Sequence, residues 1–317
     1  MDTICLKKAC DEFDNVFYQN LFGFSFLKNG YDYKLCQNLQ SLMGERFLEY
    51  NFYIFTSNWG RLPNSIHHET NRKKILLYLG DESGEVPYHL SSYYHMIFKQ
   101  YLPTDKFAVN NIFNFVLGPL APEQPYKNIE QRKYSVFFSG ALTGTRLPLY
   151  LYLSFDMILP DFIRRFFAQL IRFPFLLKLF TLRTFDSKIP NAYIRFTNGF
   201  SQGLPMEEYS KILADSKIVL CPRGAVHPEC FRHGEAMRAG CVMISQRLPL
   251  IWFYRDSPII QVDSWSRGLK IAKQLLSCPD ELECLSKLTL DWYENRCSER
   301  AMAQFMINCI DSIENAR

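Results

Sequence analysis

Short apolar runs alternate with segments whose apolar residues recur at helical spacing along most of the chain. This alternation is typical of parallel sheets wrapped by helices. The apolar runs predict strands at residues 52–56, 75–79, 114–117, 134–139, 193–197, 217–221, 241–245 and 259–262. The helical spacing predicts helices at residues 91–101, 207–215, 231–239 and 268–276. The pattern therefore predicts an α/β protein.

A proline-rich stretch at residues 118–125 interrupts this alternation. Prolines at this density can continue neither a helix nor a central strand, so the stretch is typical of a linker between domains. The length of 317 residues accommodates two α/β domains. We expect an N-terminal domain over residues 1–122 and a second domain over 123–275. C-terminal helices over 276–317 could then pack back toward the first domain.

Composition and charge narrow the class of protein. Apolar residues make up 48% and charged residues 21%, which is ordinary for a globular protein. A net charge of +4 is too small to indicate a nucleic-acid partner, but it suits a ligand that carries a diphosphate. The ten cysteines form no C-x-x-C pair, and no signal peptide or membrane-spanning run is recognisable. We therefore expect a cytoplasmic protein.

The segment 162–183 differs from the rest because it is both basic and apolar. Phe162, Phe166 and Leu170 share one helical face, and Pro174 is expected to break or kink the helix. The basic residues of the segment, which contains no acidic one, are Arg164, Arg165, Arg172, Lys178 and Arg183. Such a stretch can contact an anionic membrane surface peripherally. The alternative is a helix that covers one side of the second sheet.

The strongest chemical signal lies between the strand at 217–221 and the helix at 231–239. The turn Pro222-Arg223-Gly224 ends the strand, and the loop after it leads into a helix N-terminus. Ligands of open α/β sheets bind at the carboxyl ends of strands, and helix N-termini favour phosphate. Arg223 and Arg232 could hold a diphosphate, and Glu235 could accept the hydroxyls of a ribose. The alternative is that Arg232 and Glu235, three residues apart, form a surface ion pair.

The same residues carry a resemblance to a known family. The motif comprises Tyr209-x3-Leu213-x2-Ser216, Leu220-Cys221-Pro222-Arg223-Gly224, Phe231-Arg232-x2-Glu235-Ala236 and Gly240-Cys241, with Phe137-Phe138-Ser139-Gly140 and Arg146 upstream. It resembles the exostosin family of glycosyltransferases, in particular its compact bacterial or viral members, over about residues 75–262. The loop 225–229 departs from the basic and small residues of that pattern, which bears on the choice of donor.

The resemblance implies a GT-B fold, in which two Rossmann-like domains face each other across a cleft. It also implies an inverting transfer from a nucleotide-sugar donor, commonly a UDP-sugar, to a glycan or lipid-linked saccharide acceptor. By this likeness Arg223, Gly224 and Arg232 would lie at the diphosphate and Glu235 at the ribose. Gly140 and Arg146 would lie near the phosphates or the transferred sugar. A non-catalytic GT-B relative that binds a nucleotide-sugar or glycan is the alternative, and a metabolic enzyme acting on another sugar-phosphate is a third reading.

An inverting reaction needs a general base on the acceptor side. Asp81 and Glu82 are the best placed candidates because they follow the strand at 75–79. Further candidates are Glu85, His67, His68, His89 and His95. No Asp-x-Asp triplet is present to hold a divalent ion, so we expect no metal and no cofactor, with arginines carrying the charge of the leaving group.

Overall fold

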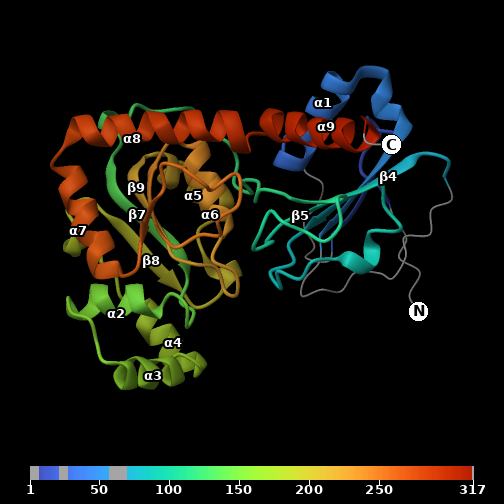
Figure 1. Cartoon of the computed structure of the whole chain (residues 1–317). Helices are drawn as coiled ribbons and strands as arrows, with labels where there is room; N and C mark the ends of the chain where they lie inside the picture. Colours follow the sequence, from blue (N-terminus) through green and yellow to red (C-terminus); the bar gives the residue numbers. More distant parts are fainter. Residues whose placement is uncertain (1–6, 21–27, 57–69, 316–317) are drawn as a thin grey trace. The chain divides into compact units, whose positions relative to one another are not determined.

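The computed structural model describes residues 7–20, 28–56 and 70–315. The chain divides into two compact units (Figure 1). Unit 1 takes in Met1–Gly118, Pro249–Arg255 and Glu294–Arg317, and unit 2 takes in Pro119–Leu248 and Asp256–Tyr293. The first crossing between the units thus falls within the proline-rich stretch. The C-terminal segment expected at 276–317 is divided, because its first helix belongs to unit 2 and its last helix to unit 1.

Unit 2 is built on a parallel sheet in the strand order β11-β10-β9-β7-β8. Its strands are β7 (Tyr134–Ala141), β8 (Tyr193–Thr197), β9 (Ser216–Cys221), β10 (Val242–Gln246) and β11 (Ile260–Val262). Five of the helices described in this unit are α2 (Leu147–Phe155), α5 (Met206–Ala214), α6 (Phe231–Arg238), α7 (Trp265–Leu276) and α8 (Pro279–Trp292). Two further helices, α3 (Asp161–Leu170) and α4 (Pro174–Thr181), precede β8.

Helices cover both faces of the unit 2 sheet (Figure 1). On one face, Phe138 and Leu220 pack with Leu149 of α2 and Leu269 of α7 in a single apolar core. On the other face, the ring of Phe137 meets the ring of Tyr209 in α5 edge to face at 5.4 Å. Strands buried on both sides explain why the sequence of this region shows continuous apolar runs rather than alternation.

The order of the strands reverses between β7 and β9. From β7 the chain passes to β8 on one side, and from β8 it returns to β9 on the other side of β7. The connections that follow β7 and β9 therefore leave the carboxyl ends of these two strands in opposite directions. This is the position at which open α/β sheets bind their ligands.

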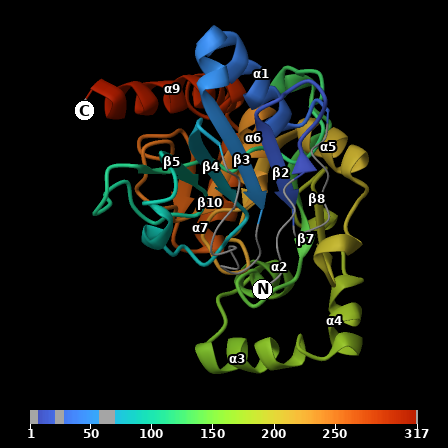
Figure 2. The same cartoon turned by 90° about the vertical axis from the view of Figure 1, so that its right-hand side faces the viewer.

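Unit 1 has a second sheet, in the order β1-β2-β3-β4-β5-β6. Its strands are β1 (Lys7–Lys8), β2 (Val16–Asn20), β3 (Tyr50–Thr56), β4 (Lys73–Leu79), β5 (Met96–Lys99) and β6 (Ile112–Asn114). All neighbours from β2 to β6 are parallel, and β1 is antiparallel to β2. Helices α1 (Tyr31–Met43) and α9 (Glu299–Asn315) lie side by side (Figures 1 and 2). The hydroxyl of Tyr31 donates to the Cys297 carbonyl at 2.7 Å just before α9.

The structure confirms the predicted α/β class with two sheet-based units. The predicted helix at 91–101 is wrong, because this segment forms β5 with all four side chains of Met96–Lys99 buried. A short apolar run that is buried on both faces fits either a strand or a helix, so its spacing misleads. The predicted strand at 114–117 is also displaced, since β6 ends at Asn114. The break expected at Pro174 is confirmed by the start of α4 at this residue.

Among the described residues, no helix is both long enough and apolar enough to cross a membrane.

A buried arginine, Arg132, joins the start of β9 to the end of α6. Arg132 is 3% exposed. Its Nε donates to the Lys127 carbonyl at 3.0 Å, and its Nη atoms donate to the carbonyls of Ser216 at 3.0 Å and Ala239 at 2.6 Å. The Ala239 carbonyl is one of the acceptors that the end of α6 leaves outside the helical ladder. Arg132 therefore caps the C-terminus of α6 and links it to the start of β9.

We predict that Arg132→Met lowers the free energy of unfolding by about 2–4 kcal/mol, because the carbonyl groups that accept from Arg132 lose their donor. Arg247→Met is the matched control, since Arg247 is 79% exposed and pairs with Asp263 at the surface. That change should cost less than about 1 kcal/mol. Urea unfolding of both variants decides the point, and equal losses would contradict the role given to Arg132.

Candidate functional site

The switch point of unit 2 brings together the residues that the sequence motif singled out. Gly140 lies near the end of β7, and Arg146 precedes α2. Arg223 and Gly224 follow β9 directly, and Arg232 lies in the first turn of α6. The two loops are joined by hydrogen bonds from Thr145 Oγ1 to the Gly224 carbonyl at 3.0 Å and from Arg146 Nε to the Arg223 carbonyl at 3.3 Å.

Arg232 is held in place but is not saturated with partners. It is 6% exposed, its Nη2 donates to the Ser139 carbonyl at 2.5 Å, and its guanidinium lies 4.8 Å from the centre of the Phe138 ring. Among the described residues, no acceptor lies within hydrogen-bonding distance of its Nε. Burying a charged donor without an acceptor costs free energy. A ligand anion that accepts from this group would recover that cost.

Gly140 allows two guanidinium groups to approach the end of β7. A Cβ atom at this position would lie 2.8 Å from Nη2 of Arg232 and 3.2 Å from Nη1 of Arg146. Both distances are shorter than ordinary contacts, so any larger residue would push the arginine side chains away. Arg146 Nη1 also donates to the Ala141 carbonyl at 3.1 Å. Gly140 is therefore a requirement of packing around the arginines.

Arg223 is anchored through its backbone and the end of its side chain. Its backbone N–H donates to Gln246 Oε1 at 3.2 Å, and its Nη2 donates to the Val226 carbonyl at 2.8 Å. Its buried Nε has no acceptor within the described part of the chain. The side chain thus resembles that of Arg232, because one of its buried donors lacks an acceptor among the described residues.

Glu235 is buried rather than exposed. It is 6% exposed, its Oε2 accepts from the Tyr209 hydroxyl at 2.8 Å, and its Oε1 accepts from the Ala121 N–H at 3.3 Å. Burial raises the pKa of Tyr209 well above its usual range and the Glu235 carboxylate adds to the rise, so the phenol keeps its proton and donates. Each carboxylate oxygen can accept a further hydrogen bond. The carboxylate is therefore oriented while retaining acceptor capacity.

The surface ion pair considered from the sequence is wrong. Arg232 and Glu235 are both buried, and in the described residues no ion pair joins them. Arg232 contacts the end of β7, whereas Glu235 contacts α5 and the segment that leads into unit 2. Although Arg232 and Glu235 lie three residues apart on α6, their side chains contact different parts of unit 2.

The N-terminus of α6 carries a thiol in an unusual setting. Cys230 is the N-cap residue, and its Sγ lies 3.5 Å from Nδ1 of His233 and 3.8 Å from Nη1 of Arg232. Burial alone would raise the pKa of this thiol, but His233, with Arg232 and Arg146, lowers it to about 6. The opposite ring nitrogen of His233 lies 2.8 Å from Ser245 Oγ, whose hydroxyl donates to the Cys221 carbonyl at 3.1 Å.

The base candidates lie in unit 1, after β4. Asp81 is 2% exposed and its Oδ2 lies 3.2 Å from Nζ of Lys99, which is fully buried. Its carboxylate also accepts from the backbone N–H and the hydroxyl of Ser83, at 3.1 and 2.9 Å. Burial acts to raise the pKa of Asp81, but the Lys99 charge and the Ser83 hydrogen bonds outweigh it and hold the pKa below its usual value. Asp81 is therefore an ionised partner of Lys99 and a weak proton acceptor.

The remaining candidates differ in exposure. Glu82 is half-buried, whereas Glu85 and His89 are exposed. His95 Nε2 lies 3.7 Å from a carboxylate oxygen of Glu314 in α9. His67 and His68 lie outside the described residues. Within the described part of the chain, His, Cys, Asp and Glu form no group of three or more that could hold a metal ion.

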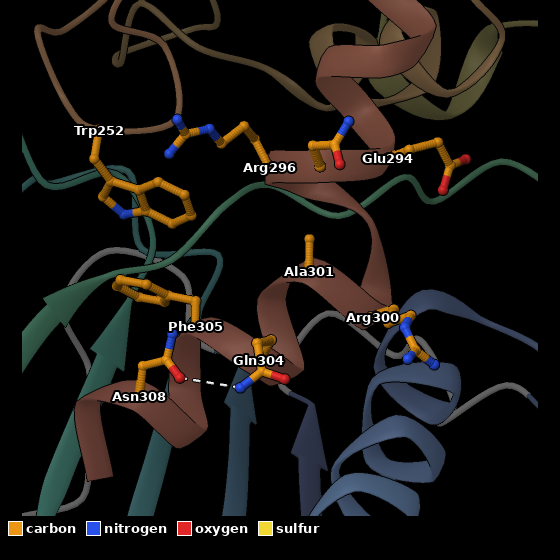
Figure 3. A pocket seen from close by; sticks show the side chains of 9 residues that line it. Trp252, Glu294, Arg296, Arg300, Ala301, Gln304, Phe305 and Asn308 are labelled. Atoms are coloured by element: carbon orange, nitrogen blue, oxygen red, sulfur yellow. Dashed lines mark hydrogen bonds between the residues drawn. The ribbon is translucent and has the colours of Figure 1, made fainter. Parts of the chain in front are cut away.

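A cavity of about 590 Å³ lies elsewhere, in unit 1 (Figure 3). Its described lining residues are Trp252, Glu294, Asn295, Arg296, Arg300, Ala301, Gln304, Phe305 and Asn308. The rings of Trp252 and Phe305 stack at 4.4 Å, and Gln304 donates to Asn308 Oδ1 at 3.0 Å (Figure 3). None of these residues belongs to the site expected from the sequence.

Among known proteins, the chain shows similarity only to solved structures. No protein-family model matches the chain, and no curated protein matches it. The chain is similar to the crystal structure of a glycosyltransferase from Rickettsia africae ESF-5, with a TM-score of 0.49 and 11% identity over 90% of this chain and 83% of that one. It is also similar to the crystal structure of TarM, with a TM-score of 0.41 and 14% identity over 87% of this chain and 57% of TarM. At these TM-scores the similarity decides neither fold nor activity.

The sequence did not reveal the partners of the candidate residues. The bonds from Tyr209 and Ala121 to Glu235 span 26 and 114 residues, and the bond from Arg232 to Ser139 spans 93. Lys99 was the one signal in the sequence for such a partner, because a lysine within a buried apolar strand is expected to pair with a buried carboxylate, here that of Asp81. Cys230 gave none, since its setting depends on the cap of α6.

We predict that Cys230 reacts with iodoacetamide with a midpoint near pH 6, because the thiolate is the reacting form and its fraction rises as pH passes the lowered pKa. The alkylation rate of the Cys230 peptide, measured by mass spectrometry across pH, gives the midpoint. The variant Cys230→Ser should lack the modified peptide. A midpoint near that of an ordinary thiol, about 8.5, would contradict the arrangement around His233.

Proposed function

We propose that the chain is a glycosyltransferase of the GT-B architecture that takes its sugar from a nucleotide-sugar, with UDP as the expected nucleotide. The proposal rests on one observation: Arg223 follows β9 at the switch point of unit 2, and Arg232 and Glu235 lie three residues apart in α6, the next helix. Two buried Nε donors lack acceptors among the described residues, and an oriented carboxylate lies on the same helix as one of them. These groups together match the oxygens of a diphosphate and the hydroxyls of a ribose.

The arginines would bind the diphosphate and stabilise it as a leaving group. The planar guanidinium presents several donors in a fixed fork, which matches phosphate oxygens. The start of α6 adds backbone N–H groups and the positive end of the helix dipole. Charge that develops on the leaving diphosphate would thus meet preorganised positive groups. We propose that the transfer needs no divalent metal for this reason.

Glu235 would recognise the ribose. A carboxylate that already accepts from Tyr209 and the Ala121 N–H has its orientation fixed before the ligand arrives. Its remaining acceptor sites could take one or both ribose hydroxyls. The acceptor would be a hydroxyl of a glycan or lipid-linked saccharide, and inversion would follow from direct attack on the anomeric carbon.

The general base would come from unit 1. The pairing of Asp81 with Lys99 lowers its capacity to take a proton, which favours the half-buried Glu82. Asp81 would then have a positioning role in the loop after β4, because its carboxylate binds Lys99 and Ser83 together.

We predict that Glu235→Gln weakens UDP binding by about ten- to a hundredfold, because a charge-assisted hydrogen bond is worth about 1.5–3 kcal/mol. Glutamine keeps the size of the side chain and one acceptor for Tyr209. Calorimetric titration with UDP in buffer that contains EDTA measures the affinity and at the same time tests binding without metal.

The control for that titration is Glu207→Gln, which changes an exposed carboxylate of α5 paired with Lys211. It should bind UDP like the unmodified protein. A folded Glu235→Gln variant with unchanged affinity would remove the nucleotide site from this position. Binding that requires a restored divalent ion would overturn the metal-independent part of the proposal.

We predict that Glu82→Gln lowers the maximal transfer rate by about 10²–10⁴-fold and leaves UDP affinity unchanged, as expected for loss of a general base. Asp81→Asn should chiefly destabilise the fold, because it leaves Lys99 buried without its carboxylate. The double variant Asp81→Asn with Lys99→Met removes the buried ammonium group as well and shows whether activity returns with stability. A normal rate in Glu82→Gln would assign the base to another residue, and UDP binding without transfer or hydrolysis in the unmodified protein would favour a binding module.

A further inference from the structure

Two helices of unit 2 present a face that the sheet does not use. Neither α3 nor α4 contains a buried residue. Phe167, Leu177 and Phe180 pack partly against the core of unit 2 and attach the two helices to it. In both views α3 and α4 lie at the edge of unit 2, with α3 on the far side of α2 from the sheet (Figures 1 and 2).

The outward side of this pair is rich in large apolar groups. We call it the α3–α4 face, and its apolar members are Phe162, Phe166, Phe173, Phe175, Leu179 and Leu182. Their side chains are between 54% and 77% exposed. Single exposed apolar residues are common on soluble proteins, but a contiguous group marks an interaction surface. The density of these residues within 162–182 indicates that the face is covered by another surface.

The segment that carries the α3–α4 face is also rich in basic residues, of which Arg164 pairs with Asp161 at the start of α3. Between residues 162 and 185 the chain has five basic residues and no acidic one. Arg165, Arg172 and Lys178 are exposed, and in the described part of the chain no carboxylate lies within ion-pair distance of them. The segment therefore carries both exposed apolar rings and a local excess of exposed cations.

This combination selects among the surfaces that could cover the face. A second copy of the chain would bring the same cations against each other, which disfavours self-pairing. A bilayer that contains anionic lipids offers negative headgroups and, directly below them, an apolar layer. Helices of ten and eight residues extend about 15 and 12 Å, roughly half of the hydrocarbon thickness, so they suit the interface.

We propose that the α3–α4 face docks the protein on a membrane surface that contains anionic lipids, with its phenylalanines at the headgroup level and its basic residues on the lipid phosphates. The inference is independent of the proposed transfer reaction, because it concerns a different part of unit 2. Both alternatives drawn from the sequence bear on it, since Phe167, Leu177 and Phe180 pack partly against the core while the residues of the α3–α4 face are exposed.

The test is sedimentation of the full chain with phosphatidylcholine vesicles, with and without about one third phosphatidylglycerol. The protein should bind the anionic vesicles, and salt should weaken binding because it screens the cations. The double variant Phe162→Ser, Phe166→Ser should bind at least about tenfold more weakly. The charge variant Arg165→Glu, Arg172→Glu should lose about twentyfold or more, since each basic residue contributes a factor of about five.

Matched controls separate the face from general surface effects. Phe200→Ser with Leu250→Ser removes two apolar groups, each 77% exposed, from outside the face. Lys270→Glu with Lys273→Glu makes the same change of charge on α7. Both controls should bind vesicles like the unmodified protein, and thermal unfolding should show that every variant is folded.

Three results would overturn the inference. The unmodified protein could fail to bind anionic vesicles, or the face variants could bind as well as the controls do. The third is concentration-dependent self-association, lost in Phe162→Ser, Phe166→Ser without any vesicle binding, which would assign the face to a second copy.

Discussion

The reversal of strand order between β7 and β9 is the constraint on which the candidate site depends. It sends the connections after these strands in opposite directions, so that neither covers the carboxyl end of the other. The side chains near the carboxyl ends of β7 and β9 are those that the two loops and the start of α6 supply. In this chain they supply Arg146, Arg223 and Arg232. The topology thus places three cationic side chains near the end of the sheet at which open α/β sheets bind their ligands.

The buried arginines of unit 2 show how one residue type serves two purposes. Arg132 donates from Nε and both Nη atoms to acceptors that join β9 to the end of α6. Arg232 is almost as buried, yet its Nε meets no acceptor in the described residues, while its Nη2 is held by the Ser139 carbonyl. Satisfied donors indicate a structural role for Arg132, whereas the Nε of Arg232 is the donor on which the proposal of a bound anion rests.

The local elements of unit 2 could be predicted because each is encoded by neighbouring residues. The buried run before Cys221, the turn at Pro222 and the helix from Phe231 follow one another within about twenty residues. The strand β5 could not be predicted in the same way, since Met96–Lys99 is short and buried on both faces. Its lysine is satisfied by Asp81, which lies eighteen residues away and was expected to face the substrate.

The candidate site shows the same contrast between features set by neighbouring residues and features set by distant ones. Arg223, Arg232 and Glu235 could be proposed from the sequence because a strand, a turn and a helix place them together. Their environment could not, because Ser139, Tyr209 and Ala121 reach them only through the packing of the sheet. Burial also removed one interpretation: the spacing of Arg232 and Glu235 allowed a surface ion pair, whereas both residues are buried.

The most direct test of this account is a crystal structure of the protein with UDP bound. The account predicts diphosphate oxygens within hydrogen-bonding distance of Arg223 or Arg232 and a ribose hydroxyl on Glu235. UDP bound elsewhere, for instance in the unit 1 cavity beside Trp252, would contradict it.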